Sequence, residues 1–181
     1  DADINQAYEE GSTPLLIACQ QGQLEVVELL LDRNADINQA SDDGATPLWI
    51  ACLNGQLEVA EFLLARGALI NQTMDGAKTP LFIACKYNRE SVVERLLAHE
   101  AIDVNRATTD DYGITPLLLS CQHGHCSIVC RLLEKGGNIS IGILNLASFY
   151  IMIPRRKDIL TLELMSSALF CIFANRLTID D

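Results

Sequence analysis

The tripeptide Thr-Pro-Leu occurs four times in this 181-residue chain, and its spacing limits the possible folds more than any other feature. It begins at Thr13, Thr46, Thr79 and Thr115, at intervals of 33, 33 and 36 residues. Around it the first two copies are near duplicates, with Ile-Ala-Cys, Gly-Gln-Leu-Glu-Val and Ala-x-Ile-Asn in the same places. A fixed period of this length indicates a repeat protein in which each copy is one small structural unit.

Each copy predicts a short helix and a longer antiparallel partner. Thr before Pro favours a helix start, because the hydroxyl can accept a free backbone N–H and Pro fits the first helical position. In the first copy Leu15, Ala18 and Cys19 then share one face, and Gly22 can end the helix in a left-handed conformation. Apolar residues recur at helical spacing over 24–32, which predicts a second, antiparallel helix.

The stretch 34–44 is rich in Asn, Asp, Ser and Gly, and it predicts a hairpin loop leading back to the next Thr-Pro. Two helices of this size bury too little apolar surface to be stable alone, so neighbouring copies must stack. The sequence therefore predicts an all-α solenoid of helix-turn-helix copies over residues 1–140.

These residues resemble ankyrin repeats, whose 33-residue period and Thr-Pro-Leu-His-x-Ala signature they follow over about three quarters of the chain. On this resemblance we place four repeats at about 8–40, 41–73, 74–107 and 108–140, after residues 1–7, which align with the end of a preceding repeat in a longer protein. The family's His ties the helix start to the adjoining loop. Its place is taken here by Leu16, Trp49, Phe82 and Leu118, where we expect apolar packing instead.

Two copies depart from the others in their loops. The third has Ala77 where the others have Gly, which predicts a reshaped loop tip, and Asn88 where a Gly would end the helix. The fourth has two extra residues between Asn105 and Thr115, so we expect a longer loop there. Longer loops often carry function.

The repeat signature is lost after Ser140. Two apolar runs, 141–153 and 159–173, are shorter than the ~20 residues that a membrane-spanning helix needs. Three interpretations of this divergent tail stay open: a helical cap on the fourth repeat, an interfacial membrane segment, and a translated non-coding sequence from a faulty gene model.

The net charge of −11 is carried by residues 1–140, which contain nine Lys or Arg against 20 Asp or Glu. An acidic body repels a phosphate backbone, which argues against a nucleic-acid partner and favours a protein with a basic surface. No signal peptide is visible. We expect an intracellular monomer, in the cytoplasm with the nucleus as the alternative.

The candidate chemical sites favour neither catalysis nor a metal. Cys19, Cys52, Cys85 and Cys121 occupy the same place in each copy, and stacked helices ~8–10 Å apart hold such residues too far apart for disulfides. We interpret them as buried thiols in a reducing compartment. The cluster of His123, His125, Cys126 and Cys130 has zinc-ligand chemistry, but its spacing fits no standard finger. We expect no cofactor, no metal and no small-molecule substrate.

Acidic residues precede each Thr-Pro, so stacking would align them as an acidic ridge on the loop tips. The alternative is that they are solvated turn residues, since Asp suits turns. In ankyrin proteins the loop tips and the exposed end of the first helix form the concave binding face, where aromatic residues such as Tyr87, Tyr112 and, unless it is core, Trp49 would be anchors. The predicted partner-binding residues are Glu9, Glu10, Gln20, Gln21, Asp42, Asp43, Leu53, Asn54, Asp75, Lys78, Lys86, Tyr87, Asp110, Asp111, Tyr112, Gln122 and His123.

The resemblance therefore implies a protein-interaction module, a scaffold or adaptor, rather than an enzyme. The alternative is that the array is the targeting or regulatory arm of a larger enzyme or channel. The ankyrin surface varies while its core stays fixed, so the sequence does not identify the partner.

Overall fold

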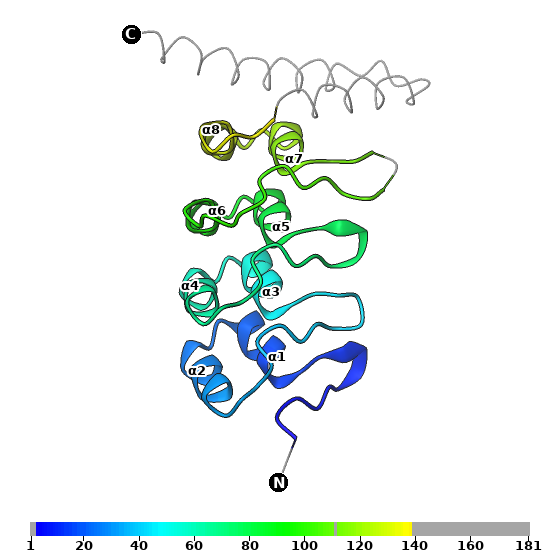
Figure 1. The fold of residues 1–181 in the computed structure, drawn as a ribbon, viewed down its shortest axis with the longest axis vertical. Coiled ribbons are helices and arrows are strands. Elements are labelled where there is room, and N and C mark those ends of the chain that lie inside the picture. Colours follow the sequence, from blue (N-terminus) through cyan, green and yellow to red (C-terminus); the bar gives the residue numbers. More distant parts are fainter. Residues whose placement is uncertain (1–2, 111, 139–181) are drawn as a thin grey trace. The chain divides into compact units, whose positions relative to one another are not determined.

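The structure is a computed structural model that describes residues 3–110 and 112–138. The predictions for Asp111 and for the tail 141–181 lie outside these residues. The chain divides into two compact units, 1–102 and 103–181, and each is described by itself. Within the described residues there are eight α-helices, two short 3-10 turns and no strand, which confirms the all-α helix-turn-helix class (Figure 1).

The helices alternate between an inner one that follows Thr-Pro and an outer one that runs back beside it. All four inner helices begin at the Pro of this motif, as predicted. The first outer helix covers the predicted range 24–32. In the first unit the helices are α1 (Pro14–Gln21), α2 (Leu24–Asp32), α3 (Pro47–Asn54), α4 (Leu57–Ala65), α5 (Pro80–Lys86) and α6 (Glu90–Leu97), and in the second they are α7 (Pro116–Gln122) and α8 (Cys126–Glu134).

The Thr side chains cap the inner helices as the sequence predicts. The Thr13 hydroxyl accepts the Leu16 backbone N–H at 3.2 Å, and the other three copies repeat this bond at 3.1–3.2 Å. At the other end of α1, Gly22 has φ 71°, and in the third copy Asn88 has φ 53°, so both take the left-handed conformation predicted for them. Local sequence thus sets both ends of these helices.

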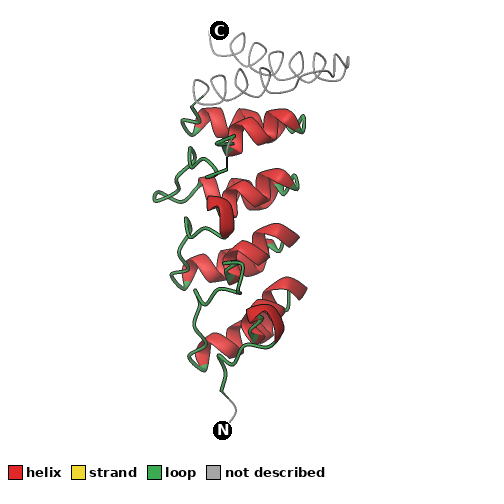
Figure 2. Cartoon of the chain, turned by 90° about the vertical axis from the view of Figure 1, so that its right-hand side faces the viewer, coloured by secondary structure: helices red, strands yellow, loops and turns green. Residues whose placement is uncertain are grey.

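In the first unit the three hairpins stack side by side. Helix α3 lies against both α1 and α5, and α4 lies against both α2 and α6 (Figures 1 and 2). The packed face of each inner helix is closed: Leu15, Leu48 and Leu81 are at most 1% exposed. Burying these side chains supplies the apolar contacts that a single hairpin lacks.

The repeated Asn that begins each loop joins one copy to the next. The Asn5 side-chain oxygen accepts the Asp36 backbone N–H at 2.8 Å, and Asn38 accepts from Leu69 at 2.9 Å. Asn71 donates its amide to the Ala101 carbonyl at 2.6 Å. These bonds fix the spacing between consecutive loops.

The second unit contains a hairpin of the same design. Helices α7 and α8 pack against each other, and Leu117, Ile128 and Leu132 are buried. Asn105 takes the role seen in the other copies, because its side-chain oxygen accepts the Asn138 backbone N–H at 2.7 Å. The fourth copy therefore repeats the local structure of the first three.

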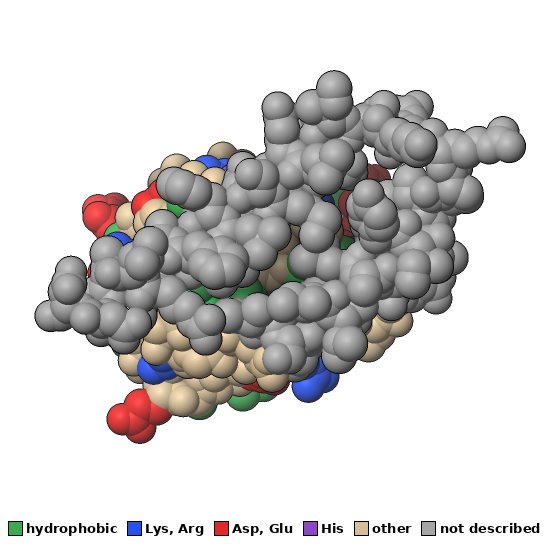
Figure 3. Space-filling view, turned by 90° about the horizontal axis from the view of Figure 1, so that it is seen from above, with side chains coloured by type: hydrophobic (Ala, Val, Ile, Leu, Met, Phe, Trp, Pro, Cys, Tyr) green, Lys and Arg blue, Asp and Glu red, His purple; other side chains and the backbone are tan. Residues whose placement is uncertain are grey.

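Charged side chains lie on the surface. Figure 3 shows Asp, Glu, Lys and Arg side chains at the perimeter of the visible described surface. Between neighbouring repeats of the first unit, Arg66, which follows α4, pairs with Asp32 at 2.5 Å, and Arg95 pairs with Glu61 at 3.6 Å. None of the helices described is both long enough and apolar enough to cross a membrane.

Candidate functional site

The loop before each inner helix folds back on itself as a finger; we number these loops finger 1 (6–12), finger 2 (39–45), finger 3 (72–78) and finger 4 (106–114). In finger 1 the Tyr8 N–H donates to the Ser12 carbonyl, and in finger 2 the Ser41 N–H donates to that of Ala45. Fingers 3 and 4 close in the same way. In Figure 1 the first three fingers project from the same side of the inner helices.

Main-chain bonds also link consecutive fingers of the first unit. The Asp42 N–H donates to the Glu10 carbonyl at 3.1 Å, and the Asp75 N–H donates to the Asp43 carbonyl at 3.0 Å. The first approach requires Gly11, because a Cβ there would lie 2.6 Å from the Asp42 nitrogen. The three finger tips of this unit are thus held in a row rather than moving independently.

Two of the predicted ridge carboxylates hold their own loops. Asp43 accepts the Ser41 hydroxyl at 2.6 Å and the Ala45 N–H at 3.2 Å. Asp110, in the second unit, accepts the Thr108 hydroxyl at 2.7 Å and the Gly113 N–H at 3.1 Å. The turn interpretation explains why Asp occupies these two positions.

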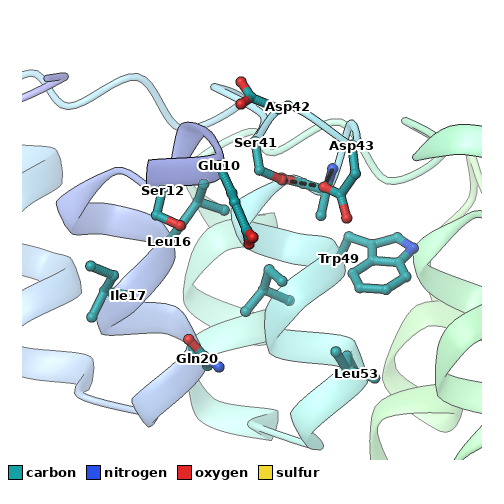
Figure 4. A pocket seen from close by; sticks show the side chains of 12 residues that line it. Glu10, Ser12, Leu16, Ile17, Gln20, Ser41, Asp42, Asp43, Trp49 and Leu53 are labelled. Carbon is teal, nitrogen blue, oxygen red and sulfur yellow. Dashed lines mark hydrogen bonds between the residues drawn. The ribbon is translucent and has the colours of Figure 1, made fainter. Parts of the chain in front are cut away.

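The remaining ridge residues of the first unit project into solvent, and they differ in direction. In Figure 4 the Glu10 side chain reaches from finger 1 down toward the inner helices, whereas Asp42 points away from them. Glu9 accepts the neighbouring Tyr8 hydroxyl at 3.2 Å. Asp75, on finger 3, is exposed, and the same finger carries Lys78. Negative charge is therefore concentrated on fingers 1 and 2.

Below these two fingers lies an open groove of about 530 Å³ between α1 and α3 (Figure 4). Ile17 is 48% exposed there, and Ile50 and Leu53 are half-buried. The groove is lined by Glu10, Ser12, Leu16, Ile17, Gln20, Ser41, Asp42, Asp43, Ala45, Trp49, Ile50 and Leu53. Its floor is thus largely apolar, and its finger side is acidic.

The predicted helix-end residues fall into two groups. Gln20, on α1, and Leu53, on α3, line the groove together with the finger residues. Gln21 is exposed, and Asn54 donates its amide back to the Ile50 carbonyl of its own helix at 2.9 Å. In the second unit Gln122 is half-buried and His123 is exposed.

The aromatic residues considered as binding anchors differ in their exposure to solvent. Tyr87 and Tyr112 are 47% and 43% exposed, and the Lys86 ammonium lies 5.5 Å from the centre of the Tyr87 ring. Trp49 is only 6% exposed, which confirms that it is a core residue. Its indole N–H donates to the Lys78 carbonyl at 3.2 Å, so at this position a hydrogen bond to the adjoining loop accompanies the expected apolar packing.

The His and Cys cluster of the fourth copy is spread over a turn and a helix. The His123 and His125 rings stack with centres 5.6 Å apart, and a His123 ring nitrogen lies 2.9 Å from the Leu119 carbonyl. Cys126 is exposed and Cys130 is half-buried on α8. Across residues 3–110 and 112–138, no group of three or more His, Cys, Asp or Glu is placed to hold a metal ion.

The four repeated cysteines are buried, as predicted, and they are free thiols. Burial raises the pKa of Cys19 to about 12. It also raises the pKa of Cys121 to about 11, and Cys126 contributes to this shift. Burial also raises the pKa of Cys52, and Cys85 nearby raises it further. Cys19, Cys52 and Cys121 stay protonated at neutral pH, so they lack the thiolate that a nucleophile needs.

The sequence interpretation included Leu53 but missed Ile17 and Ile50 on the apolar floor of the groove. Ile17 lies off the buried face of α1, but with Gln20 and Gln21 it forms an i, i+3, i+4 set on the same side of the helix. The same spacing in α3 joins Ile50 to Leu53 and Asn54. That second periodicity was the available signal for an apolar floor.

Comparison with known families agrees with this geometry. The family model described as ankyrin repeats (3 copies) matches residues 1–74 and again residues 70–143. The search of curated proteins finds no match to the chain. The two family matches cover most of the sequence and include every helix described above. The chain belongs to the ankyrin-repeat family.

Proposed function

We propose that the chain is a scaffold or adaptor whose first three repeats bind a protein with a basic surface through fingers 1 and 2 and the groove beneath them. Ankyrin repeats, the family to which the chain belongs, form a non-catalytic fold that generally binds protein partners. The observation that carries the proposal is that Glu10, Asp42 and Asp43 line the finger side of an open groove with an apolar floor. Apolar surface surrounded by polar groups is typical of protein-binding sites.

Charge supports this partner class. Fingers 1 and 2 together carry Glu9, Glu10, Asp42 and Asp43 and no Lys or Arg. Such a patch attracts a positively charged surface and speeds its association at low salt. The same charge opposes binding to a phosphate backbone, so nucleic acid is outside the proposal. We place the protein in the cytoplasm, because its buried free thiols suit a reducing compartment.

The proposal is tested by reversing charge on the fingers. The double variant Glu9→Lys and Asp42→Lys should weaken binding of the protein captured from a cell extract by about tenfold or more, and should abolish the fall in affinity with rising salt. The control is Glu25→Lys with Glu58→Lys, which makes the same charge change at the starts of the outer helices α2 and α4.

Circular dichroism must show unchanged helix content in both variants. Equal affinity of the finger variant and the wild-type protein would contradict the proposed site. An equal loss in the control variant would mean that net charge alone governs binding. Salt-independent binding by the wild-type protein would remove the argument for a basic partner.

A further inference from the structure

The groove between α1 and α3 combines two chemistries within reach of one another. Ile17 and Leu53 lie on its floor, where Ile17 is 48% exposed. Glu10 reaches toward that floor from finger 1, as Figure 4 shows. An apolar side chain that entered the groove would therefore lie close to a carboxylate.

We propose that the groove takes a peptide segment of the partner in which an apolar side chain adjoins a Lys or Arg. The apolar side chain covers Ile17, Ile50 and Leu53, and the cation pairs with Glu10. This proposal rests on the proposed function, because it specifies the part of the partner that enters the site.

The charges around the groove favour a cation at the finger side. Among the described residues that line it, three carry carboxylates and none is Lys or Arg. In the third copy the sign changes, since Lys78 lies on finger 3 and Lys86 at the end of α5. The partner's basic side chain therefore belongs at fingers 1 and 2 rather than farther along the row.

The size and form of the groove favour a chain segment. Its volume of about 530 Å³ is in the range of sites that hold a few side chains. It lies open along the surface between two helices, so a backbone can pass across it. Covering exposed Ile17 and half-buried Leu53 removes apolar area from water, which is the main source of affinity in such contacts.

The first arm of the test selects peptides. A phage library of random 12-residue peptides is panned on the folded chain, and the enriched peptides are sequenced. We expect Lys or Arg within two residues of Leu, Ile, Met or an aromatic residue. Enriched peptides without that pair, or no enrichment at all, would overturn the proposal.

The second arm separates a direct pair with Glu10 from general attraction. For the best peptide, Glu10→Gln should weaken binding about tenfold, because the carboxylate that meets the cation is lost. Asp42→Asn should cost about twofold, because that side chain points away from the floor and acts only at a distance. Glu25→Gln, on α2, should leave the affinity unchanged. Equal losses at Glu10 and Asp42 would overturn the pairing.

The third arm tests the apolar floor with matched substitutions. Leu53→Ala should weaken binding of the peptide by about tenfold. Leu69→Ala should leave the affinity unchanged, because Leu69 is 57% exposed but lies outside the groove. If Leu53→Ala lowers the helix content, then Ile17→Ala, at a more exposed position, gives the same test. Unchanged peptide binding in a folded groove variant would overturn the proposal.

The outcomes distinguish this inference from the proposed function. The library could yield basic peptides without an apolar residue, whose binding is weakened equally by Glu10→Gln and Asp42→Asn. That result would exclude the groove but leave a basic partner on the fingers. Enriched peptides that are acidic or neutral would contradict both. Only apolar–basic peptides that lose affinity in both Glu10→Gln and Leu53→Ala support the groove as the binding site.

Discussion

The two faces of the inner helices follow opposite rules. On the packed face, Cys19, Cys52 and Cys85 are the same residue in each copy of the first unit and are completely buried. On the groove face, the equivalent positions Gln20, Leu53 and Lys86 are neutral polar, apolar and basic. Packing against a neighbour that is itself repeated demands one residue type, whereas contact with solvent or a partner does not. The comparison predicts where substitutions affect stability and where they affect binding.

The largest predicted effect is on the packed face. Leu48 is 1% exposed on α3, and Leu48→Ala should lower the free energy of unfolding by about 3 kcal/mol, because it removes buried contacts and leaves a cavity. Leu53→Ala, on the groove face of the same helix, should cost less than about half of that. Urea denaturation followed by circular dichroism measures both. Equal losses would show that the two faces do not differ.

Alkaline pH should also act through the packed face. Below about pH 8.5 a thiol is protonated in both the unfolded and the folded state. The stability that comes from burying the neutral thiol is therefore fully present there. As pH rises further, the unfolded chain loses the proton but buried Cys19 and Cys52 retain it, because burial raises the pKa of both. Stability should fall by about 1.4 kcal/mol per pH unit for each such thiol, until pH reaches the folded pKa.

The control for this effect is Cys52→Ala, which removes one thiol from the column. Between pH 9 and 10 the free energy of unfolding should fall less for the variant than for the wild-type protein. The difference between the two falls should be about 1.4 kcal/mol, the contribution of one thiol. Denaturation at fixed temperature in matched buffers gives the comparison. Parallel curves for the two proteins would mean that the Cys52 thiol is not held protonated by the fold.

Within residues 3–110 and 112–138, the helices and their ends could be predicted almost completely from the sequence. Thr-Pro fixed the start of every inner helix, and the left-handed residues Gly22 and Asn88 marked helix ends, because caps and turns depend on residues adjacent in the chain. Burial of the repeated cysteines followed from their period alone. The Asn5 and Asn38 bonds to the following copy did not follow, because a period identifies equivalent residues without showing what each one touches.

The candidate site could be predicted only in outline. The acidic finger tips were visible in the sequence, but the opposite directions of Glu10 and Asp42 depend on the turn in each finger. Finger 1 places both Glu10 and Gly11 at positive φ, whereas in finger 2 the equivalent Asp43 is not among the positive-φ residues and Gly44 is. Of the equivalent residues Glu10 and Asp43, Asp43 accepts hydrogen bonds from its own loop, which composition cannot reveal.

A smaller effect is expected at the helix start, on the packed side. Thr46 is 2% exposed and its hydroxyl accepts the Trp49 N–H at 3.2 Å. Thr46→Ala should cost about 1 kcal/mol, because that N–H loses its partner. Thr46→Ser keeps the hydroxyl and should recover most of the loss. Equal destabilisation by Ala and Ser, measured by urea denaturation, would assign the effect to the lost methyl group instead of the cap.

The smallest effect has the opposite sign, and it concerns the finger that faces the groove. Glu10 has φ 57° and is followed by Gly11 at φ 72°, a pair of left-handed residues in which Asn-Gly is strongly preferred. Glu10→Asn should therefore raise the free energy of unfolding by about 0.5 kcal/mol, because Asn adopts this conformation at lower cost than Glu. The same change removes the carboxylate, so it should weaken binding of the basic partner. A variant that is more stable and binds less well would show that this finger residue serves binding rather than folding. No gain in stability would mean that Glu10 fits its turn as well as Asn does, and the contrast between the packed and groove faces would then rest on the helices alone.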